Sequence, residues 1–368
     1  MIGAGGRNAG KTGFACAVIR RLSTSVPVIG VKVTAISERD DECPRGGEGC
    51  GTCASFSGQC LVTEERGELP GKDTSRMLAA GAKKVFWVRV MRESLAQAAA
   101  EVKGLLEPGQ VMICESNSMR LLVEPDLFFI VREKGSTACK PTCAAVAHLA
   151  DCQIESDRDI FSLPPEKVDF AFGHWTFKRN ATAIVMAGGD SARMGRDKAL
   201  LEIEGEPMIS RIVSRLEPSF ERVVISAAGA GDLGFLGKEV IPDEAPGAGP
   251  LMALVSALEK SKTELNFIMP CDVPDPPQHL LARLLREASN AEVAVPVNAR
   301  GELEPLFAVY KKSVLPSARE ALAQGKRRVI SFYPQHKVKQ VPLNPDDNLL
   351  NLNTIADYLT RLNNGVKP

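Results

Sequence analysis

Short apolar runs and amphipathic stretches alternate along most of the chain. Apolar residues spaced by three and four positions are typical of helices with one buried face, whereas short runs rich in β-branched residues are typical of buried strands. In the first half, these patterns predict helices over residues 11–22, 73–80 and 93–106, and strands over 26–33, 85–90, 111–114 and 127–131. Strands separated by helices of this length predict a mostly parallel sheet with helices on both faces.

The alternation is interrupted between residues 155 and 180, where short polar runs and two consecutive prolines occur. It starts again at Ala181 and predicts strands over 181–186, 223–226, 240–242, 266–269, 293–297 and 306–310, with helices over 207–216, 251–260, 279–288 and 314–322. We therefore predict an α/β protein with two domains, residues 1–160 and 181–368, joined by a linker over residues 161–180. Each domain is expected to contain a mostly parallel sheet with flanking helices.

Length and composition agree with two folded domains. A chain of 368 residues is longer than one hydrophobic core usually supports, and 44% hydrophobic with 24% charged residues is typical of globular proteins. The 45 basic residues are balanced by 45 acidic residues, so no net charge attracts a nucleic acid or an anionic membrane. Because the sequence lacks a membrane-length apolar run and a basic-then-apolar leader, we expect a cytoplasmic protein with small molecules or proteins as partners.

A glycine-rich basic loop follows the predicted strand over residues 181–186 and reads Met-Ala-Gly-Gly-Asp-Ser-Ala-Arg-Met-Gly-Arg-Asp-Lys. Loops at the carboxyl ends of parallel strands are where open α/β sheets bind ligands. Gly188 and Gly189 let the backbone approach a base or a phosphate closely. Arg193 and Lys198 supply positive charge for a triphosphate. The loop therefore predicts a nucleotide site, with a solvated strand-to-helix turn as the alternative.

This loop resembles the signature of the molybdenum cofactor guanylyltransferase family, Leu-Ala-Gly-Gly-x-x-x-Arg-Met-Gly-x-x-Lys, with Met186 in place of the leucine. Further segments follow in the family's order, namely Ile-Pro-Asp at 241–243, Pro-Gly-Ala-Gly-Pro-Leu at 246–251, Met-Pro-Cys-Asp-Val-Pro at 269–274, Glu-Pro-Leu-Phe-Ala at 304–308 and Asn-Leu-Asn-Thr at 351–354. The resemblance covers about residues 181–360 and implies a Rossmann-like nucleotidyltransferase domain.

The resemblance also implies a reaction, in which GMP is transferred from GTP to the terminal phosphate of molybdopterin and pyrophosphate is released. By motif, it implies a guanine and phosphate loop at Ala187, Gly188 and Gly189, a phosphate contact at Lys198, a guanosine contact at Asp243, a Mg²⁺ ligand at Asp272, and the molybdopterin side of the site at Asn351 and Asn353. A phosphate nucleophile is already ionised, so positioning and charge neutralisation supply most of the acceleration. A carboxylate such as Asp272 offers the hard oxygen ligand that Mg²⁺ prefers, although a turn-capping aspartate is the alternative.

Two other functions stay open. Related transferases that use CTP resemble this pattern with Ala-Ala-Gly where this chain has Ala187-Gly188-Gly189, which favours guanine over cytosine here. The first alternative is therefore cytidylyl transfer to the same cofactor. The second is a non-catalytic adaptor that binds GTP and molybdopterin and delivers the cofactor to molybdoenzyme apoproteins.

The start of the chain contains a second nucleotide motif, because residues 5–12 fit the P-loop pattern Gly-x-x-x-x-Gly-Lys-Thr. The backbone after Gly10 and the side chain of Lys11 are expected to surround phosphates, and the hydroxyl of Thr12 is expected to reach Mg²⁺. One departure is that only Met1 and Ile2 precede the glycines, whereas a P-loop normally follows a buried strand.

This half resembles the molybdopterin-guanine dinucleotide accessory GTP-binding family, in the P-loop and in residues 29–32, 71–74, 79–82, 114–117 and 125–126. The resemblance implies a P-loop NTPase-like accessory domain over residues 1–160. Where that family has His-Thr-His-His after a lysine, this chain has Val-Thr-Ala-Ile at 33–36, so any role of those histidines is absent. Glu115 either helps to order Mg²⁺ or water, or is an exposed loop acid.

A cysteine-rich insertion over residues 43–60 contains Cys43, Cys50, Cys53 and Cys60. Four thiols around one Cys-x-x-Cys pair in a glycine-rich loop suit tetrahedral Zn²⁺ or an iron–sulfur cluster, with unliganded thiols or a disulfide as the alternative. A second group either contributes ligands or packs in the core, namely Cys139, Cys143 and Cys152. The histidines are isolated in the sequence and are interpreted as structural or surface residues, namely His148, His174, His279 and His336.

Overall fold

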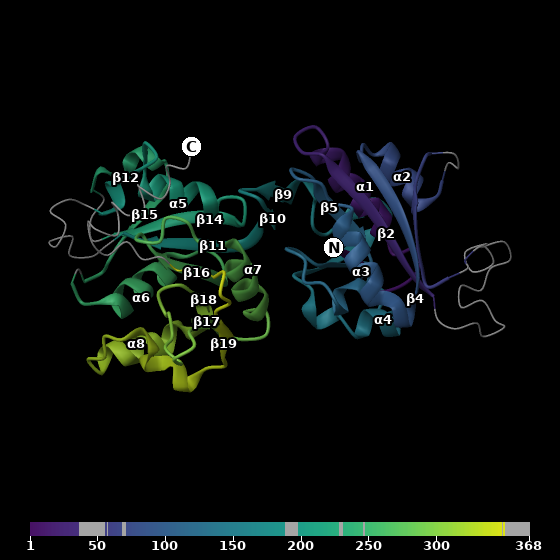
Figure 1. Ribbon diagram of the computed structural model, residues 1–368. Coiled ribbons are helices and arrows are strands. Elements are labelled where there is room, and N and C mark those ends of the chain that lie inside the picture. The colour runs from purple at the N-terminus through teal and green to yellow at the C-terminus, as the bar shows by residue number, and fades with distance from the viewer. Residues whose placement is uncertain are drawn as a thin grey trace. The chain divides into compact units, whose positions relative to one another are not determined.

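The structure is a computed structural model, and it describes residues 1–36, 56, 58–67, 71–187, 198–227, 231–245, 247–347 and 349. The chain divides into two compact units, Met1–Phe170 and Ala171–Pro368. Figure 1 shows that each unit contains a sheet with helices packed against it. The predicted α/β fold class is therefore confirmed.

The first unit is built on an eight-stranded sheet with the strand order β3-β4-β2-β5-β1-β6-β7-β8. The six inner strands are parallel, and the two edge strands β3 and β8 run antiparallel to their neighbours. The strands are β1 (Ile2–Ala4), β2 (Val28–Ile36), β3 (Cys60–Glu64), β4 (Lys84–Met91), β5 (Val111–Glu115), β6 (Phe129–Glu133), β7 (Cys152–Asp157) and β8 (Ile160–Phe161). The α-helices are α1 (Lys11–Leu22), α2 (Asp73–Ala79), α3 (Leu95–Gly104) and α4 (Pro141–Ala144).

Strand β1 lies inside this sheet although it contains only three residues. It pairs in parallel with β5 and β6, and all three of its residues are buried. The sequence pattern did not reveal it because so short an apolar run has no periodicity to recognise. The P-loop therefore follows a buried strand, which removes the departure noted in the sequence.

The second unit is built on a seven-stranded sheet with the strand order β15-β14-β11-β16-β18-β17-β19. The strands are β11 (Arg179–Met186), β14 (Phe220–Ala227), β15 (Glu239–Pro242), β16 (Leu265–Pro270), β17 (Val293–Val297), β18 (Ala308–Lys311) and β19 (Val338–Pro342). Only β18 is antiparallel to its neighbours. The helices are α5 (Met208–Leu216), α6 (Pro250–Lys260), α7 (Gln278–Glu287) and α8 (Leu315–Ala323).

Two small two-stranded sheets complete the described structure. One joins β12 (Glu202–Ile203) to β13 (Glu206–Pro207), and the other joins β9 (Val168–Ala171) to β10 (His174–Phe177). The second of these falls inside residues 161–180, which the sequence analysis assigned to a linker. A strand pair of four residues each is too short to stand out against the surrounding polar and proline-rich sequence.

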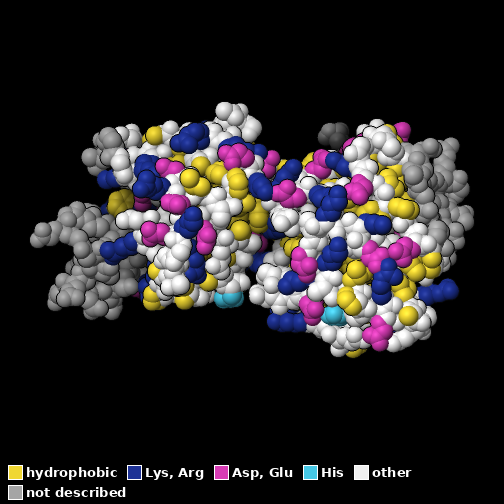
Figure 2. Space-filling view, turned by 180° about the vertical axis from the view of Figure 1, so that it is seen from behind, with side chains coloured by type: hydrophobic (Ala, Val, Ile, Leu, Met, Phe, Trp, Pro, Cys, Tyr) yellow, Lys and Arg dark blue, Asp and Glu magenta, His cyan; other side chains and the backbone are white. Residues whose placement is uncertain are grey.

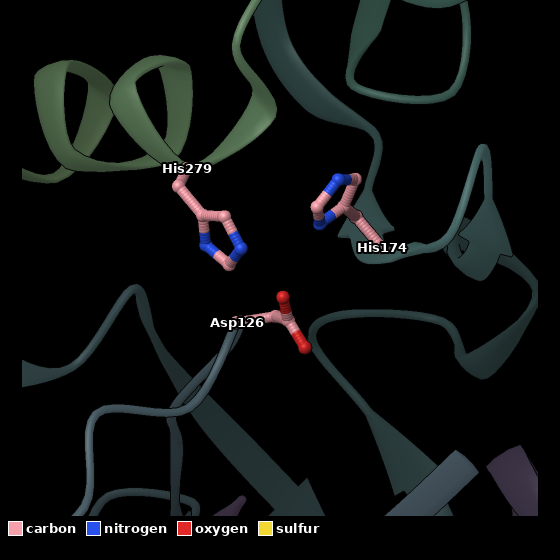
Figure 3. A group of neighbouring side chains, drawn as sticks. All are labelled: Asp126, His174 and His279. Carbon is pink, nitrogen blue, oxygen red and sulfur yellow. The ribbon is translucent and has the colours of Figure 1, made fainter. Parts of the chain in front are cut away.

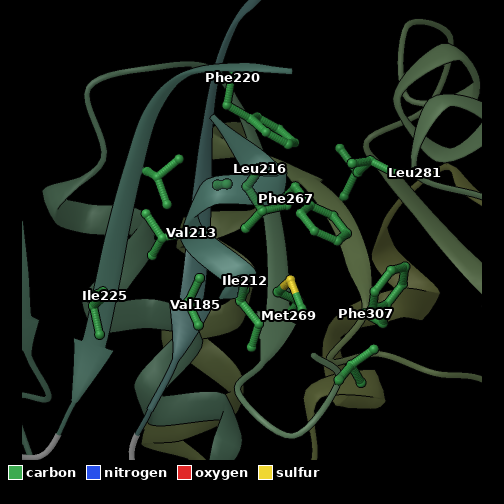
Figure 4. Close-up of a cluster of buried hydrophobic side chains, with 14 of the residues drawn as sticks. Val185, Ile212, Val213, Leu216, Phe220, Ile225, Phe267, Met269, Leu281 and Phe307 are labelled. Carbon is green, nitrogen blue, oxygen red and sulfur yellow. The ribbon is translucent and has the colours of Figure 1, made fainter. Parts of the chain in front are cut away.

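A buried aromatic and aliphatic cluster holds the strands of the second unit in place (Figure 4). The ring of Phe267 on β16 stacks on Phe220 at 5.7 Å between centroids and meets Phe307 edge to face at 5.0 Å. Fully burying one such side chain stabilises the fold by about 1.5–3 kcal/mol. Because Phe307 precedes β18, this packing also positions the segment that leads into β18.

Surface chemistry agrees with the balanced composition. On the face drawn in Figure 2, basic and acidic side chains of the described residues are interspersed. Among the helices of the described residues, none is long and apolar enough to cross a membrane.

Candidate functional site

Three of the residues selected from the sequence lie at one edge of the sheet in the second unit. Ala187 directly follows β11, Asp243 follows β15, and Asp272 follows β16 by two residues. The strands β15, β14, β11 and β16 are adjacent and parallel, so their carboxyl ends meet at the same edge. This is the edge at which open α/β sheets bind their ligands.

Hydrogen bonds fix the start of each loop. The amide of Ala187 donates to the carbonyl of Ser226 at 2.7 Å, and the hydroxyl of Ser226 donates to the carboxylate of Asp243 at 3.1 Å. The amide of Cys271, next to Asp272, donates to the carbonyl of Met186 at 3.1 Å. Ser226, on the strand between β15 and β11, therefore links two of the candidate residues, a connection that the sequence analysis missed.

Asp272 lines a cavity of about 210 Å³ together with Pro270, Val273, Glu304, Pro305, Leu306, Phe307 and Leu349. Glu304 reaches this cavity because β18 runs antiparallel to β16, so the start of β18 lies beside the end of β16. Burial, together with the nearby charge of Glu302, raises the pKa of the Glu304 carboxyl. A cavity that holds Asp272 and a second acid beside apolar walls suits a cation that neutralises negative charge.

Most of the other residues selected in this unit lie outside the described residues. Gly188, Gly189 and Arg193 belong to the loop after β11, and Asn351 and Asn353 follow β19 in the chain. Lys198 is the first residue of a short 3₁₀ helix, Lys198–Leu200, and only its backbone is among the described parts of the chain. Their roles therefore stay predictions.

In the first unit the P-loop lies between β1 and α1, at the carboxyl edge of the sheet. Gly10 has a left-handed φ of 84°, and a Cβ at that position would collide with the hydroxyl of Ser156. The side chain of Asn117 fixes the end of β1, because its Oδ1 accepts from the amide of Ala4 at 2.8 Å and its Nδ2 donates to the carbonyl of Ala4 at 3.0 Å. The loop conformation thus depends on glycine at one position and on an asparagine side chain behind it.

A pocket of about 680 Å³ opens above the P-loop, and Gly10, Lys11 and Thr12 all line it. Its other charged lining residues come from several elements, namely Arg7, Lys32, Asp73, Arg76, Arg92, Lys140, Arg158 and Asp159. Basic side chains therefore outnumber acidic ones. Such an excess of positive charge favours a polyanion such as a nucleoside triphosphate.

Two carboxylates lie close to the P-loop. Glu115, at the end of β5, is fully buried, and its Oε2 lies 3.3 Å from the ammonium of Lys11. Asp73, at the start of α2, forms an ion pair with Lys32 and accepts a hydrogen bond from the hydroxyl of Thr12. Burial raises the pKa of the Asp73 carboxyl, but Lys32, Lys11 and Thr12 together lower it further, so the pKa lies below its usual range.

The structure describes only some of the cysteines for which a metal site was predicted. Cys60 begins β3, whereas Cys43, Cys50 and Cys53 lie outside the described residues. Cys143 is buried beside Phe128, Ile130 and Val146, which supports its interpretation as a packing residue, and Cys139 is exposed. The described cysteines form no disulfide with one another.

Two histidines that the sequence analysis interpreted as isolated are in contact. The rings of His174 on β10 and His279 on α7 meet edge to face, with centroids 4.7 Å apart (Figure 3). Because the two histidines are far apart in the chain, their spacing in the sequence could not predict this contact. His336 is likewise not isolated, because its Nδ1 lies 3.0 Å from Glu292 and its Nε2 contacts the hydroxyl of Ser317.

Residues 183–339 match the MobA-like NTP transferase domain. A probable molybdenum cofactor guanylyltransferase from Carboxydothermus hydrogenoformans is 36% identical over 187 residues, which are 49% of this chain and 94% of that protein. Another from Pelotomaculum thermopropionicum is 38% identical over 162 residues, 44% of this chain and 78% of that protein. The crystal structure of molybdopterin-guanine dinucleotide biosynthesis protein A from Archaeoglobus fulgidus is 22% identical with a TM-score of 0.44, covering 51% of this chain and 100% of that chain.

The second unit is therefore a nucleotidyltransferase domain. The chain belongs to the molybdenum cofactor guanylyltransferase family, and these relatives correspond to about half of its length.

Proposed function

We propose that this protein transfers GMP from GTP to the terminal phosphate of molybdopterin and releases pyrophosphate. Family membership carries the proposal, and the arrangement of the second unit supports it, because Ala187, Asp243 and Asp272 lie at one sheet edge. Ala187, Gly188 and Gly189 hold the guanine and the phosphates in this proposal, and Asp243 contacts the guanosine. Arg193 and Lys198 neutralise the phosphates, while Asn351 and Asn353 face molybdopterin.

The described residues suit Mg²⁺ at Asp272. Its carboxylate is a hard oxygen ligand, and the cavity that it lines contains a second acid, Glu304. Bound Mg²⁺ would offset negative charge on the phosphates during the transfer. The protein's own contribution is to place Asp272 and the nucleotide loop at a fixed separation, since the packing of Phe267 against Phe220 and Phe307 holds β16 in the sheet.

We further propose that the first unit is an accessory domain that binds GTP through its P-loop. The basic pocket above Gly10, Lys11 and Thr12 supports this role. In one chain, a linker keeps the two units at a high effective concentration, which is a physical reason for joining them. In the same proposal, the accessory domain comprises residues 1–160 and the nucleotidyltransferase domain comprises residues 181–368.

The cysteine-rich insertion is proposed to bind Zn²⁺ or an iron–sulfur cluster through Cys43, Cys50, Cys53 and Cys60. Four thiolates with one Cys-x-x-Cys pair support a tetrahedral site. Metal analysis of a variant with all four replaced by serine tests this directly. Loss of zinc or iron relative to the parent protein is expected, and an unchanged metal content would exclude the insertion.

The decisive experiment measures pyrophosphate release by the purified protein with Mg²⁺, molybdopterin and either GTP or CTP. We expect release with GTP, and a fall of about 100-fold or more in Asp272→Ala, because the Mg²⁺ that would offset charge on the phosphates loses its proposed ligand. Asp275→Asn is the matched control: this acid lies three residues further on and pairs with Arg211 at 2.8 Å. Faster pyrophosphate release with CTP than with GTP would identify cytidylyl transfer as the reaction. No release with either nucleotide, although molybdopterin is bound, would favour a non-catalytic adaptor.

A further inference from the structure

Two cysteines enclose a short segment of the P-loop pocket. Cys139 lies just before α4 and Cys143 lies within it, and their thiols are joined by a hydrogen bond. Residues four apart in a regular helix have Cβ atoms about 5–6 Å apart, whereas a disulfide needs about 3.5–4.5 Å. Because Cys139 is exposed and lies outside the helix, a small movement of its backbone can supply the remaining approach.

The two thiols differ in what can reach them. Cys139 is exposed, and the guanidinium of Arg132 donates to its sulfur at 3.7 Å. Positive charge beside a sulfur attracts the thiolate, which is the form that attacks oxidants. Cys143 is 0% exposed. Burial raises the pKa of the Cys143 thiol and the hydrogen bond with Cys139 raises it further, whereas Arg132 and Lys140 act in the opposite direction. A solvent oxidant therefore meets Cys139 first, and Cys143 can react only with its neighbour.

The residues between the two cysteines belong to the nucleotide pocket. Lys140 and Thr142 both line it. The amide of Lys140 donates to the carbonyl of Gly5, the first glycine of the P-loop, at 2.9 Å. The hydroxyl of Thr142 accepts from Nδ2 of Asn117 at 3.3 Å, and the same asparagine side chain holds the end of β1. Backbone movement between the cysteines is therefore passed to both ends of the P-loop's first turn of chain.

The segment before Cys139 is packed tightly against the P-loop. A Cβ at Gly5 would lie 2.8 Å from the carbonyl of Ala138, which leaves no room for that carbonyl to move closer. The guanidinium of Arg132 donates to the same carbonyl at 3.4 Å. A displacement of Cys139 toward α4 must therefore strain or break the contacts of this segment with Gly5.

We propose that Cys139 and Cys143 form an oxidisable thiol pair whose disulfide weakens nucleotide binding at the P-loop. The oxidant is a peroxide, and hydrogen peroxide is its simplest member. The Cys139 thiolate attacks one peroxide oxygen, the O–O bond breaks, and the departing hydroxide takes up a proton to become water, which leaves Cys139 as a sulfenic acid. The Cys143 sulfur then attacks the Cys139 sulfur, the S–O bond breaks, and the oxygen leaves as water with the Cys143 proton. Two thiols and one hydrogen peroxide thus give one disulfide and two water molecules.

Peptide mapping of the full chain tests the disulfide independently of any nucleotide. The reduced protein is treated with hydrogen peroxide, the remaining thiols are alkylated, and the protein is digested with trypsin. Cleavage after Lys134 and Arg158 gives one peptide that contains Cys139, Cys143 and Cys152. We expect a peptide lighter by two hydrogen atoms, with the alkyl group on Cys152.

Three variants locate the bond. Cys139→Ser and Cys143→Ser should each abolish the lighter peptide, whereas Cys152→Ser, the matched control in the same peptide, should retain it. Arg132→Gln should form the disulfide about threefold more slowly or less, because the positive charge beside the attacking sulfur is lost. Should Cys143→Ser fail to fold, the exposed Cys139→Ser decides the question.

The effect on binding rests on the proposed nucleotide site at the P-loop and is measured separately. A fluorescent GTP analogue is titrated into reduced and oxidised protein, and the binding that Lys11→Ala removes defines the P-loop site. Oxidation should weaken this binding by about tenfold, a usual size for coupling between two sites, and dithiothreitol should restore it. Cys139→Ser, oxidised in parallel, should keep its affinity, because the peroxide then has no route to Cys143.

Several outcomes would overturn the inference. Oxidation of Cys139 to sulfinic or sulfonic acid while Cys143 stays open to alkylation would exclude the pair, as would a disulfide from Cys139 to a cysteine of the insertion. A disulfide that forms without a change in affinity would overturn its effect on the nucleotide, and an equal loss of affinity in oxidised Cys139→Ser would assign that effect to another cysteine. Absence of any binding removed by Lys11→Ala would overturn the P-loop proposal, whereas the disulfide would still be seen by peptide mapping.

Discussion

The two units place their candidate sites at the same kind of position but supply them with charge in different ways. Both sites lie at the carboxyl edge of a mostly parallel sheet. In the first unit, the charged groups that line the pocket come both from helices and strands, such as Lys11, Lys32 and Asp73, and from loops, and basic groups outnumber acidic ones. In the second unit, the described cavity holds Asp272 and Glu304 among apolar walls, and the basic residues expected on the phosphates follow β11 in the loop.

The comparison indicates that the order of the strands determines where a site lies, whereas the residues near the ends of the strands determine its charge. The parallel order of strands brings loops together in both units. What those loops hold depends on a few residues that follow each strand. Disturbing the units separately therefore tests whether the two sites are independent.

Among the variants that compare the two units, Gly10→Ala in the first unit is expected to have the largest effect. An alanine at a left-handed φ of 84° is strained by about 1–2 kcal/mol, and its Cβ would also collide with Ser156. Nucleotide affinity of the P-loop should fall by more than about tenfold, measured by titration with a fluorescent GTP analogue. Pyrophosphate release by the second unit should be unchanged.

Gly6→Ala is the matched control for this prediction, because a Cβ at Gly6 would meet no atom within 4 Å. It lies in the same loop and also lines the pocket, and it should lose less nucleotide affinity than Gly10→Ala because its own conformation is not strained. An equal loss of affinity in both variants would show that the loop is sensitive to any side chain, and a loss of pyrophosphate release in Gly10→Ala would show that the two sites are coupled.

A smaller effect is expected from Tyr310→Phe in the second unit. The buried Tyr310 hydroxyl donates to the carbonyl of Pro305 at 2.6 Å, and Pro305 lines the Asp272 cavity. Leaving this carbonyl and the Tyr333 hydroxyl without their partner should lower the free energy of unfolding by about 1–3 kcal/mol, measured by urea denaturation. Tyr333→Phe, which keeps the bond to Pro305, should cost less, and an equal cost would contradict this account.

The smallest perturbation uses cysteine chemistry in the first unit. Burial raises the pKa of the Cys114 thiol to about 11, so only about one molecule in a thousand carries the reactive thiolate at pH 8. Because this pKa lies above pH 8, the rate at which iodoacetamide alkylates Cys114 should rise as the pH increases toward 11. Mass spectrometry after iodoacetamide treatment at pH 8 should find the exposed Cys139 modified well before Cys114. Equal rates would mean that the sheet interior opens readily.

Helices and strands with clear periodicity could be predicted, and short ones could not. The helix predicted over residues 11–22 coincides with α1, and the strand over 293–297 coincides with β17. The helix predicted over 93–106 is shorter, because α3 begins at Leu95 after a 3₁₀ turn and ends at Gly104. Strands such as β1 and β8 contain two or three residues, too few for a period to be visible in the sequence.

The α/β class, the two nucleotide motifs and the family could be predicted from the sequence, because these depend on residues that are close together in the chain. Which distant side chains share a site depends on the tertiary structure. It brought Asp73 and Glu115 to the first turn of α1, and Glu304 to the cavity of Asp272. Strand order explains this, since β5 lies between β1 and β2 in the sheet although it follows both in the sequence, and β18 runs antiparallel beside β16.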